Sequence, residues 1–289
     1  MIASSELIIN PDGSIFHLHL KPGEIADTIL LVGDPGRADM IARFFDSIEV
    51  KKENREFVSR TGTYHGKRIT VLATGIGTDN IDIVVTELDA LVNVDFTTRE
   101  IKPEKKSLNL IRIGTSGSLQ PDIPIGTFVI SKKSIGFDGL LNFYAHRDNV
   151  SDLDFETYFM NATHWNQSLA SPYVVDCSEE LHQLIAGNDT VDGINISAPG
   201  FYGPQGRVVR LPLADPMLNE KIEKFSYNGQ RITNYEMESS AIYGLSRLLG
   251  HKALTICTII ANRVNLKANE TYKDAMEVLI KLVLNRISA

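Results

Sequence analysis

The feature that most constrains this chain is a short apolar run ending in a turn that carries two glycines. Thr28-Ile29-Leu30-Leu31-Val32 is followed directly by Gly33-Asp34-Pro35-Gly36-Arg37. A buried strand that runs into such a turn is how α/β proteins bring backbone N–H groups up to an anion. The arginine adds a forked donor that is always charged. The turn therefore predicts a phosphate-binding site within an α/β fold.

Composition limits the class of partner. The chain has 289 residues, 43% of them hydrophobic, and its net charge is −7 from 36 acidic and 29 basic residues. This balance disfavours a broad nucleic-acid or anionic-membrane surface. Cys177 and Cys257 are too far apart to indicate a metal site or a disulfide framework. No signal peptide and no membrane-length apolar run is visible, so we expect a soluble, cytoplasmic protein.

Strands and helices alternate along the chain, which predicts a single-domain α/β sandwich around a mixed sheet, with residues 1–15 as an N-terminal extension. Strands are expected at 28–33, 55–63, 67–74, 108–113, 126–131, 193–198, 231–235 and 253–260. Helices are expected at 38–45, from an N-cap at Asp79 or Asn80 to 93, after a cap at Ser178 to 185, and at 215–225, 237–248 and 270–287. Residues 95–107 indicate a surface insertion, and residues 141–173 indicate loops and short helices.

Three glycine-rich turns follow predicted strands, at Gly33 to Arg37, Gly75 to Thr78 and Gly114 to Gly117. In open α/β sheets the strand ends gather around one crevice, where ligands bind. We therefore expect at least two of these turns to line a common site. Neither a dinucleotide fingerprint nor a P-loop is present.

Two arginines near these turns have alternative interpretations. Arg112 lies inside an apolar strand pattern, and a buried guanidinium is costly unless it is paired. Its partner is either a bound anion or an Asp or Glu of the protein. Arg55, in Asn54-Arg55-Glu56-Phe57, is either a second anion contact or a solvated charge on an edge strand.

Two carboxylates flank a methionine in Asn234-Tyr235-Glu236-Met237-Glu238-Ser239-Ser240, where a strand gives way to a helix. One of them could accept hydrogen bonds from paired sugar hydroxyls while Met237 packs on the sugar. Alternatively, Glu236 favours the helix dipole and Glu238 is a surface residue.

The loop Phe201-Tyr202-Gly203-Pro204-Gln205-Gly206-Arg207 offers an amide beside a guanidinium. That pair can match a ring edge with a carbonyl next to an N–H, such as the edge of uracil, and Phe201 could stack on the ring. Alternatively, this is a polar surface loop with a hydrophobic anchor.

In this order, Gly33-Asp34-Pro35-x-Arg37, Arg112-Ile-Gly-Thr-x-Gly117 and Asn234-Tyr-Glu-Met-Glu-Ser239 resemble the nucleoside phosphorylase-I family. The Gln205-x-Arg207 loop resembles its uridine phosphorylase branch, and the likeness runs from about Phe16 to Leu284. The resemblance implies a three-layer α/β/α sandwich around a mixed, partly barrel-like central sheet.

The resemblance also implies a role for each site residue. Phosphate would be held by Gly33, Arg37, Arg112 and Thr115, and by Arg55 from a neighbouring subunit. Ribose would be bound by Glu236, Met237 and Glu238, and its 5′-hydroxyl by His17 of the neighbour. The base would contact Phe201, Gln205, Arg207, Ile260, Ala261 and Arg263. Arg207, Gln205 and Arg112 would carry the catalysis.

The implied reaction converts uridine and inorganic phosphate to uracil and ribose 1-phosphate, with phosphate as co-substrate and no metal or organic cofactor. The purine branch has a catalytic Asp where this chain reads Ala261-Asn262-Arg263. The turn at Gly75 lacks the Gly-Pro-Ser ending of hexameric relatives, which argues against their intersubunit potassium site. The resemblance implies a homo-oligomer, at least a dimer, with shared active sites. A purine or broad-specificity phosphorylase, a nucleosidase using water, and a nucleoside-binding protein without turnover remain alternatives.

Overall fold

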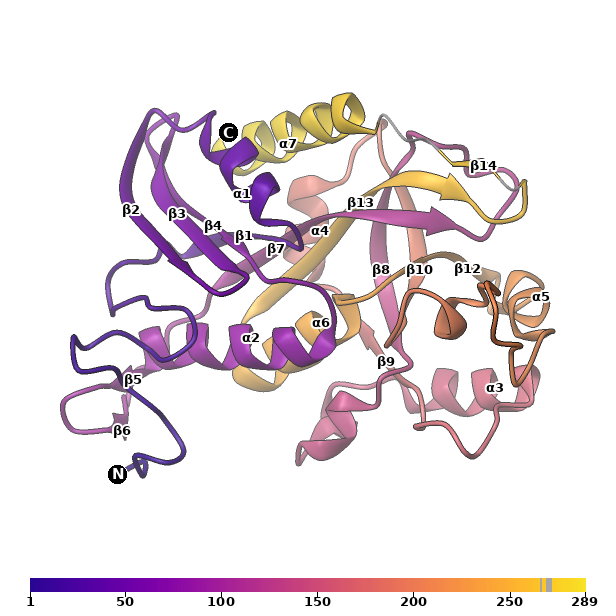
Figure 1. Cartoon of the computed structure of the whole chain (residues 1–289), viewed down its shortest axis with the longest axis horizontal. Helices are drawn as coiled ribbons and strands as arrows, with labels where there is room; N and C mark the ends of the chain where they lie inside the picture. Colours follow the sequence, from indigo (N-terminus) through magenta and orange to yellow (C-terminus); the bar gives the residue numbers. More distant parts are fainter. Residues whose placement is uncertain (266, 269–271) are drawn as a thin grey trace.

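A large mixed β-sheet forms the centre of the molecule (Figure 1). The computed structural model describes residues 1–265, 267–268 and 272–289. The strands of the main path are, in spatial order, β11 (Ser226–Tyr227), β12 (Gln230–Glu236), β10 (Val191–Ser197), β8 (Phe128–Gly136), β13 (Lys252–Asn262), β7 (Asn109–Ser118), β1 (Thr28–Val32), β4 (Lys67–Ala73), β3 (Phe57–Tyr64) and β2 (Ser47–Asn54). Short strands β9 (Tyr173–Asp176) and β14 (Lys267–Ala268) pair with β8 and β13, and β5 (Val94–Asp95) pairs with β6 (Glu100–Ile101).

One end of this sheet curls until it meets itself. Strand β12 runs parallel to β10 and also pairs antiparallel with β7, through Asn234 opposite Ser118 and Tyr235 opposite Gly117. Strands β7, β13, β8, β10 and β12 therefore form a partly closed barrel, while β1, β4, β3 and β2 continue as an open sheet (Figure 1). The expected sandwich around a mixed, partly barrel-like sheet is confirmed.

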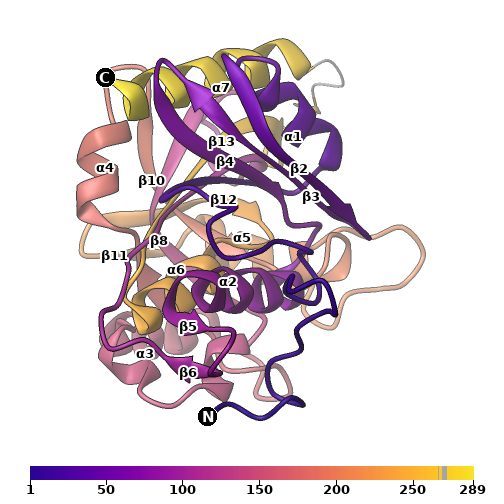
Figure 2. The ribbon, with the colours of Figure 1, turned by 90° about the vertical axis from the view of Figure 1, so that its left-hand side faces the viewer.

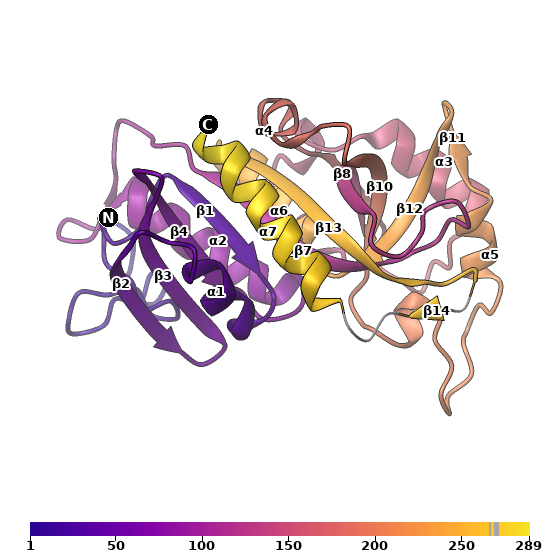
Figure 3. The ribbon, with the colours of Figure 1, turned by 90° about the horizontal axis from the view of Figure 1, so that it is seen from above.

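Helices cover both faces of the sheet, because each face presents apolar side chains. On one face lie α2 (Thr78–Asn93) and α6 (Ser239–Leu249), and on the other lie α1 (Pro35–Ala42), α4 (Glu179–Ile185) and α7 (Lys273–Ser288) (Figure 2). A hydrophobic core lies on each face of the sheet, and neighbouring residues of β1 belong to different cores. Leu31 packs with α2, and Leu30 packs with α1 and α7. Seen from above, α7 lies across β7 and β13 (Figure 3).

The remaining helices lie around the barrel end. They are α3 (Leu153–Thr163), α5 (Leu218–Glu223) and the 3₁₀ turns η1 (Leu140–Phe143), η2 (Arg147–Asn149) and η3 (Gly203–Gln205). Segment 141–173 thus contains the loops and short helices that its sequence predicts. In the part of the chain that the structure describes, no helix is long and apolar enough to cross a membrane.

Element types agree with the sequence prediction more closely than element ends do. Helix α1 begins at Pro35, three residues before the predicted start, because Asp34 caps it by accepting the Gly36 N–H at 2.9 Å. Strand β2 is missing from the prediction, since its charged, mostly exposed sequence gives no strand signal at the sheet edge. The predicted start of the last helix, at residues 270–271, lies outside the described residues.

The prediction of a turn at Gly114 to Gly117 is wrong. Strand β7 continues through these residues to Ser118, because β13 runs beside it as far as Asn262. Gly114 is required for space rather than for a turn, since a Cβ there would lie 2.2 Å from Nη1 of Arg112. The glycine leaves room for a guanidinium that folds back over its own strand.

The predicted cap of α2 at Asp79 or Asn80 is also wrong. The helix begins at Thr78 after Gly77, which has φ of 98° and no side-chain cap. The Gly77 N–H instead donates to the Glu238 carboxylate at 2.9 Å. A residue 161 positions away in the chain thus takes the place of a local cap.

Candidate active site

One cavity of about 780 Å³ collects most of the predicted site residues. It lies at the carboxyl ends of the parallel strands β1, β7 and β13, where β12 closes the barrel. The sequence candidates that line it are Gly33, Arg37, Arg112, Thr115, Phe201, Gln205, Arg207, Glu236, Met237, Glu238, Ile260, Ala261 and Arg263. Ile76 also lines it, so all three glycine-rich segments reach one crevice as expected.

The first end of the cavity carries two neighbouring buried guanidinium groups. Among the described residues, Arg37, on α1, makes one long hydrogen bond, from Nη1 to the Ile113 carbonyl at 3.4 Å. Its burial, together with the positive charge of Arg112, lowers the pKa of Arg37. Thr115 also lines this cavity. Two cations held together at the mouth of a strand-helix turn are suited to bind an oxyanion.

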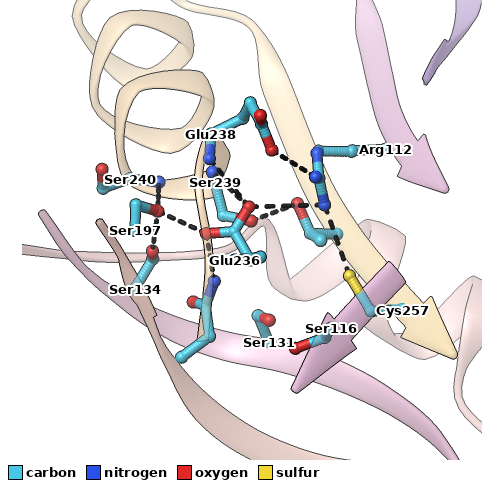
Figure 4. A network of polar contacts seen from close by, with 12 residues as sticks. Arg112, Ser116, Ser131, Ser134, Ser197, Glu236, Glu238, Ser239, Ser240 and Cys257 are labelled. Carbon is cyan, nitrogen blue, oxygen red and sulfur yellow. Dashed lines mark hydrogen bonds and ion pairs between the residues drawn. The ribbon is translucent and has the colours of Figure 1, made fainter. Parts of the chain in front are cut away.

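Arg112 has carboxylate partners from the protein itself (Figure 4). Nη2 donates to Glu238, and Nη1 lies 3.3 Å from Glu236 Oε2 and 3.3 Å from Cys257 Sγ. Burial opposes the positive charge, but the attraction of Glu238 and Glu236 outweighs it, so the pKa of Arg112 is raised. The sequence allowed either a bound anion or a protein carboxylate as the partner of Arg112. In this structure the guanidinium is paired with the protein carboxylates.

The two carboxylates have different environments. Glu236 accepts Asn195 Nδ2 at 2.6 Å, the Ser197 hydroxyl, and the N–H groups of Glu238 and Ser239 at 2.9 and 3.0 Å. With Arg112 also beside it, the acceptor capacity of Glu236 is filled by the protein. From the described residues, Glu238 receives only the Arg112 guanidinium and the Gly77 N–H. Its burial raises its pKa despite Arg112. Glu238 is therefore the carboxylate with capacity to accept from a ligand.

The second end of the cavity is rich in donors. Arg207 Nη1 donates to Gln205 Oε1 at 2.6 Å, and its guanidinium carbon lies 3.7 Å from the centre of the Phe201 ring. Arg263 Nη2 donates to the Gln205 carbonyl at 2.9 Å. Its Nη1 is buried without a hydrogen-bond partner among the described residues. Burial and the nearby charge of Arg263 lower the pKa of Arg207 to about 10. At this end, the described residues leave one buried guanidinium nitrogen without an acceptor.

His17 and Arg55 lie outside this cavity. Glu87, which lies 2.6 Å from His17 Nδ1, is ten residues along α2 from Gly77, or about 15 Å at the helical rise of ~1.5 Å per residue. Arg55 is exposed at the tip of the β2–β3 hairpin, and its neighbour Asn54 donates to the His17 carbonyl at 2.8 Å. The two residues therefore share a surface region, and neither of them lines the chain's own cavity.

Several residues that support the site were absent from the sequence prediction. Asn195 and Ser197 hold Glu236, Gly77 holds Glu238, and Cys257 contacts Arg112. One signal was available, because Asn195 and Ser197 alternate with isoleucines and so share a face of an otherwise apolar strand. Among residues 1–265, 267–268 and 272–289, no group of three His, Cys, Asp or Glu side chains could hold a metal ion.

Comparison with known proteins shows which family this chain belongs to. The family model of the phosphorylase superfamily matches residues 27–287, nearly the whole chain. The chain belongs to the phosphorylase superfamily. A uridine phosphorylase from Thermococcus kodakarensis is 30% identical over 90% of this chain and 82% of its own length. A DeoD-type purine nucleoside phosphorylase from Colwellia psychrerythraea is also 30% identical, over 93% of this chain and 98% of its own length.

A solved structure supports the same family. The nucleoside phosphorylase from Trypanosoma brucei, described as showing uridine phosphorylase activity, superposes on this phosphorylase with a TM-score of 0.87 at 30% identity. The match covers 98% of this chain and all of the other. Pyrimidine and purine enzymes resemble this phosphorylase equally in percentage identity, so the choice of base rests on the residues that line the cavity.

Proposed function

We propose that this phosphorylase cleaves uridine with inorganic phosphate, releasing uracil and ribose 1-phosphate. The observation that carries the proposal is the donor-rich end of the cavity, built from Gln205, Arg207 and Arg263. A uracil edge presents two carbonyl acceptors around one N–H, which two guanidinium groups and one amide can match. The acidic residues lining the cavity, Asp34, Glu236 and Glu238, are already engaged with helix α1 or with Arg112.

The proposed reaction places phosphate at the Arg37 and Arg112 end, beside Thr115. A phosphate oxygen bonds to C1′ of the ribose while the C1′–N1 bond breaks, and the bonding electron pair passes to uracil N1 and O2. Positive charge builds on the sugar in such a transition state, and the neighbouring phosphate stabilises it. Arg207 and Gln205 stabilise the charge on the departing base, which then takes up a proton.

The Arg112–Glu238 ion pair links the two substrates in this scheme. When phosphate takes the Arg112 guanidinium, the Glu238 carboxylate becomes free to accept from the 2′- and 3′-hydroxyls of ribose. Met237 packs on the sugar, and Ile260 and Ala261 form the apolar wall beside the base. Glu236 holds this arrangement from behind through the start of α6. No metal or organic cofactor takes part.

We further propose that the active form is a homo-oligomer, at least a dimer, in the cytoplasm. His17 and Arg55 lie in one surface region and do not line their own cavity, as residues serving a neighbouring copy would do. In this arrangement Arg55 reaches the phosphate and His17 reaches the 5′-hydroxyl of a nucleoside bound to the other chain.

The test is a cleavage assay with uridine, thymidine, inosine and adenosine, each with and without phosphate. We expect uridine to be consumed only when phosphate is present, with ribose 1-phosphate as the second product. Preferential cleavage of inosine would instead favour the purine reading that the Colwellia relative suggests. Release of free ribose without phosphate would indicate a nucleosidase, and stabilisation by uridine without products would indicate a binding protein.

A further inference from the structure

The buried carboxylate of Glu87 holds the His17 segment against the middle of α2. Glu87 is only 8% exposed. Its Oε2 accepts the Leu18 N–H at 2.9 Å, and its Oε1 lies 3.1 Å from the His17 backbone nitrogen and 2.6 Å from Nδ1 of the His17 ring. Three N–H groups from two consecutive residues converge on one carboxylate, which is more than a backbone anchor needs.

This contact decides which ring nitrogen carries the hydrogen. An ionised carboxylate can only accept, so Nδ1 must be the donor. In the neutral ring Nε2 is then an acceptor, directed away from Glu87. The ring is also packed edge-on against Phe16 and Phe57, at centroid distances of 4.7 and 6.4 Å, while 26% of the side chain stays exposed. The imidazole is therefore held in one tautomer, with Nε2 on the side of the ring that faces away from Glu87.

Through His17, the Glu87 carboxylate is also connected to the tip of the β2–β3 hairpin. The His17 carbonyl accepts Asn54 Nδ2 at 2.8 Å, and the next residue, Arg55, has a positive φ of 54°. A chain of contacts thus runs from Glu87 through His17 to Asn54, directly before Arg55. Both residues that we assign to a neighbouring site depend on this one anchor.

We propose that Glu87 is a positioning residue for the reaction, which presents Nε2 of His17 as an acceptor for the 5′-hydroxyl of a nucleoside bound to a neighbouring copy. The inference rests on the proposed function, because it takes the nucleoside and the shared site from there. Glu87 touches no substrate itself, and its effect passes entirely through the orientation and tautomer of His17.

The test compares uridine with 5′-deoxyuridine, which lacks the hydroxyl that His17 would contact. Glu87→Gln keeps the size, and an amide oxygen in the Oε2 position can still accept the His17 and Leu18 N–H groups, while the amide NH2 can donate to Nδ1 and reverse the tautomer. We expect kcat/KM for uridine to fall about five- to tenfold, the effect of one hydrogen bond, while kcat/KM for 5′-deoxyuridine changes less than about twofold. His17→Ala should give the same pattern, and the double variant should be no worse than His17→Ala alone.

An equal loss on both substrates, or additive losses in the double variant, would overturn the role of Glu87. Should Glu87→Gln not accumulate as folded protein, Glu87→Asp, which keeps the charge and shortens the reach, is compared on the same two substrates. If His17→Ala shows no loss specific to uridine, the shared-site assignment fails and the role of Glu87 fails with it. If the unchanged protein does not phosphorolyse uridine at all, the proposed function itself is wrong.

Discussion

Several side chains in this cavity are both buried and charged, although burial alone would disfavour the charged form. Glu236 and Glu238 face Arg112 and stabilise its charge, whereas the acceptors that the described residues offer Arg207 are neutral, and the charge of Arg263 repels it. A ligand carbonyl or a departing anionic base would relieve Arg207, and it would do so more strongly as charge develops. In the proposed reaction, Arg207 therefore gains a charged partner as the base departs.

Replacing Arg207 tests this directly. Arg207→Met should remove about 2–4 kcal/mol of transition-state stabilisation, because the charge on the leaving base loses its partner. The value of kcat/KM for uridine should therefore fall roughly 30- to 900-fold. The KM for phosphate should stay nearly constant, since Arg207 lies at the other end of the cavity. Steady-state kinetics with each substrate varied in turn measures both quantities.

The matched control is Arg210→Met, three residues along the same loop. Arg210 is exposed and does not line the 780 Å³ cavity. Its loss should leave kcat/KM within about twofold. Comparable damage from both substitutions, or a parallel rise in the KM for phosphate, would contradict a specific role for Arg207 at the base.

Among the elements, the β8–β9 region depends on one buried ammonium group. Lys133 Nζ, on β8, lies 2.7 Å from Asp176 at the end of β9 and 2.7 Å from Asp152, the N-cap of α3. Burial works against the charge of Lys133, but hydrogen bonds to Asp152 and Asp176 prevail and raise its pKa. One side chain thus joins a strand pair to a helix start.

Lys133→Met should destabilise the protein at pH 7 by about 1–3 kcal/mol, because two carboxylates then face each other without a cation. Lys133 also lowers the pKa of Asp152 against the opposing effect of burial. Stability that comes from a lowered Asp pKa is present above its ordinary value near 3.8 and is lost as pH falls through the lower folded value. The difference between variant and parent should therefore shrink as pH drops below 3.8.

Urea denaturation across this pH range measures the effect. Lys132→Met serves as the matched control, since Lys132 is 43% exposed and lies 3.9 Å from Glu179. Its substitution should change the free energy of unfolding by no more than about 0.5 kcal/mol. A Lys133→Met penalty that is absent at pH 7, or that grows toward acid, would show that the ion pairs do not stabilise this region.

At the scale of the whole molecule, the cavity and the His17–Arg55 surface belong to different parts of one chain. The cavity forms where the barrel closes between β7 and β12, whereas His17 and Arg55 lie beside α2 and the β2–β3 hairpin. If both parts serve one reaction, a complete site needs two copies of the chain. This separation makes a complementation experiment possible.

Mixed subunits should regain activity that neither variant has alone. Arg55→Ala keeps Glu238 intact, and Glu238→Gln keeps Arg55 intact, so a mixed dimer contains one complete site. Random exchange makes half of the dimers mixed, and about a quarter of the parental activity should return. Native mass spectrometry verifies the exchange. No recovery after verified exchange would refute a site shared through Arg55.

The sequence alone was sufficient for what depends on near neighbours. The apolar run before Gly33 predicts β1 and the turn that follows it, and the expected strands at 55–63 and 67–74 correspond to β3 and β4, because these patterns repeat over a few residues. Thirteen of the candidate residues that the family resemblance implies also line one cavity, at the edge of the sheet where the ends of parallel strands meet.

Only the tertiary structure decided how those residues pair. Whether Arg112 faces an anion or a carboxylate depends on Glu236 and Glu238, more than 120 positions further along the chain. The same holds for the cap of α2 by Glu238 and for the tautomer of His17, set by Glu87 across 70 positions. Such contacts satisfy buried charges and N–H groups, and burial exists only once the chain has packed. No local pattern contains that information.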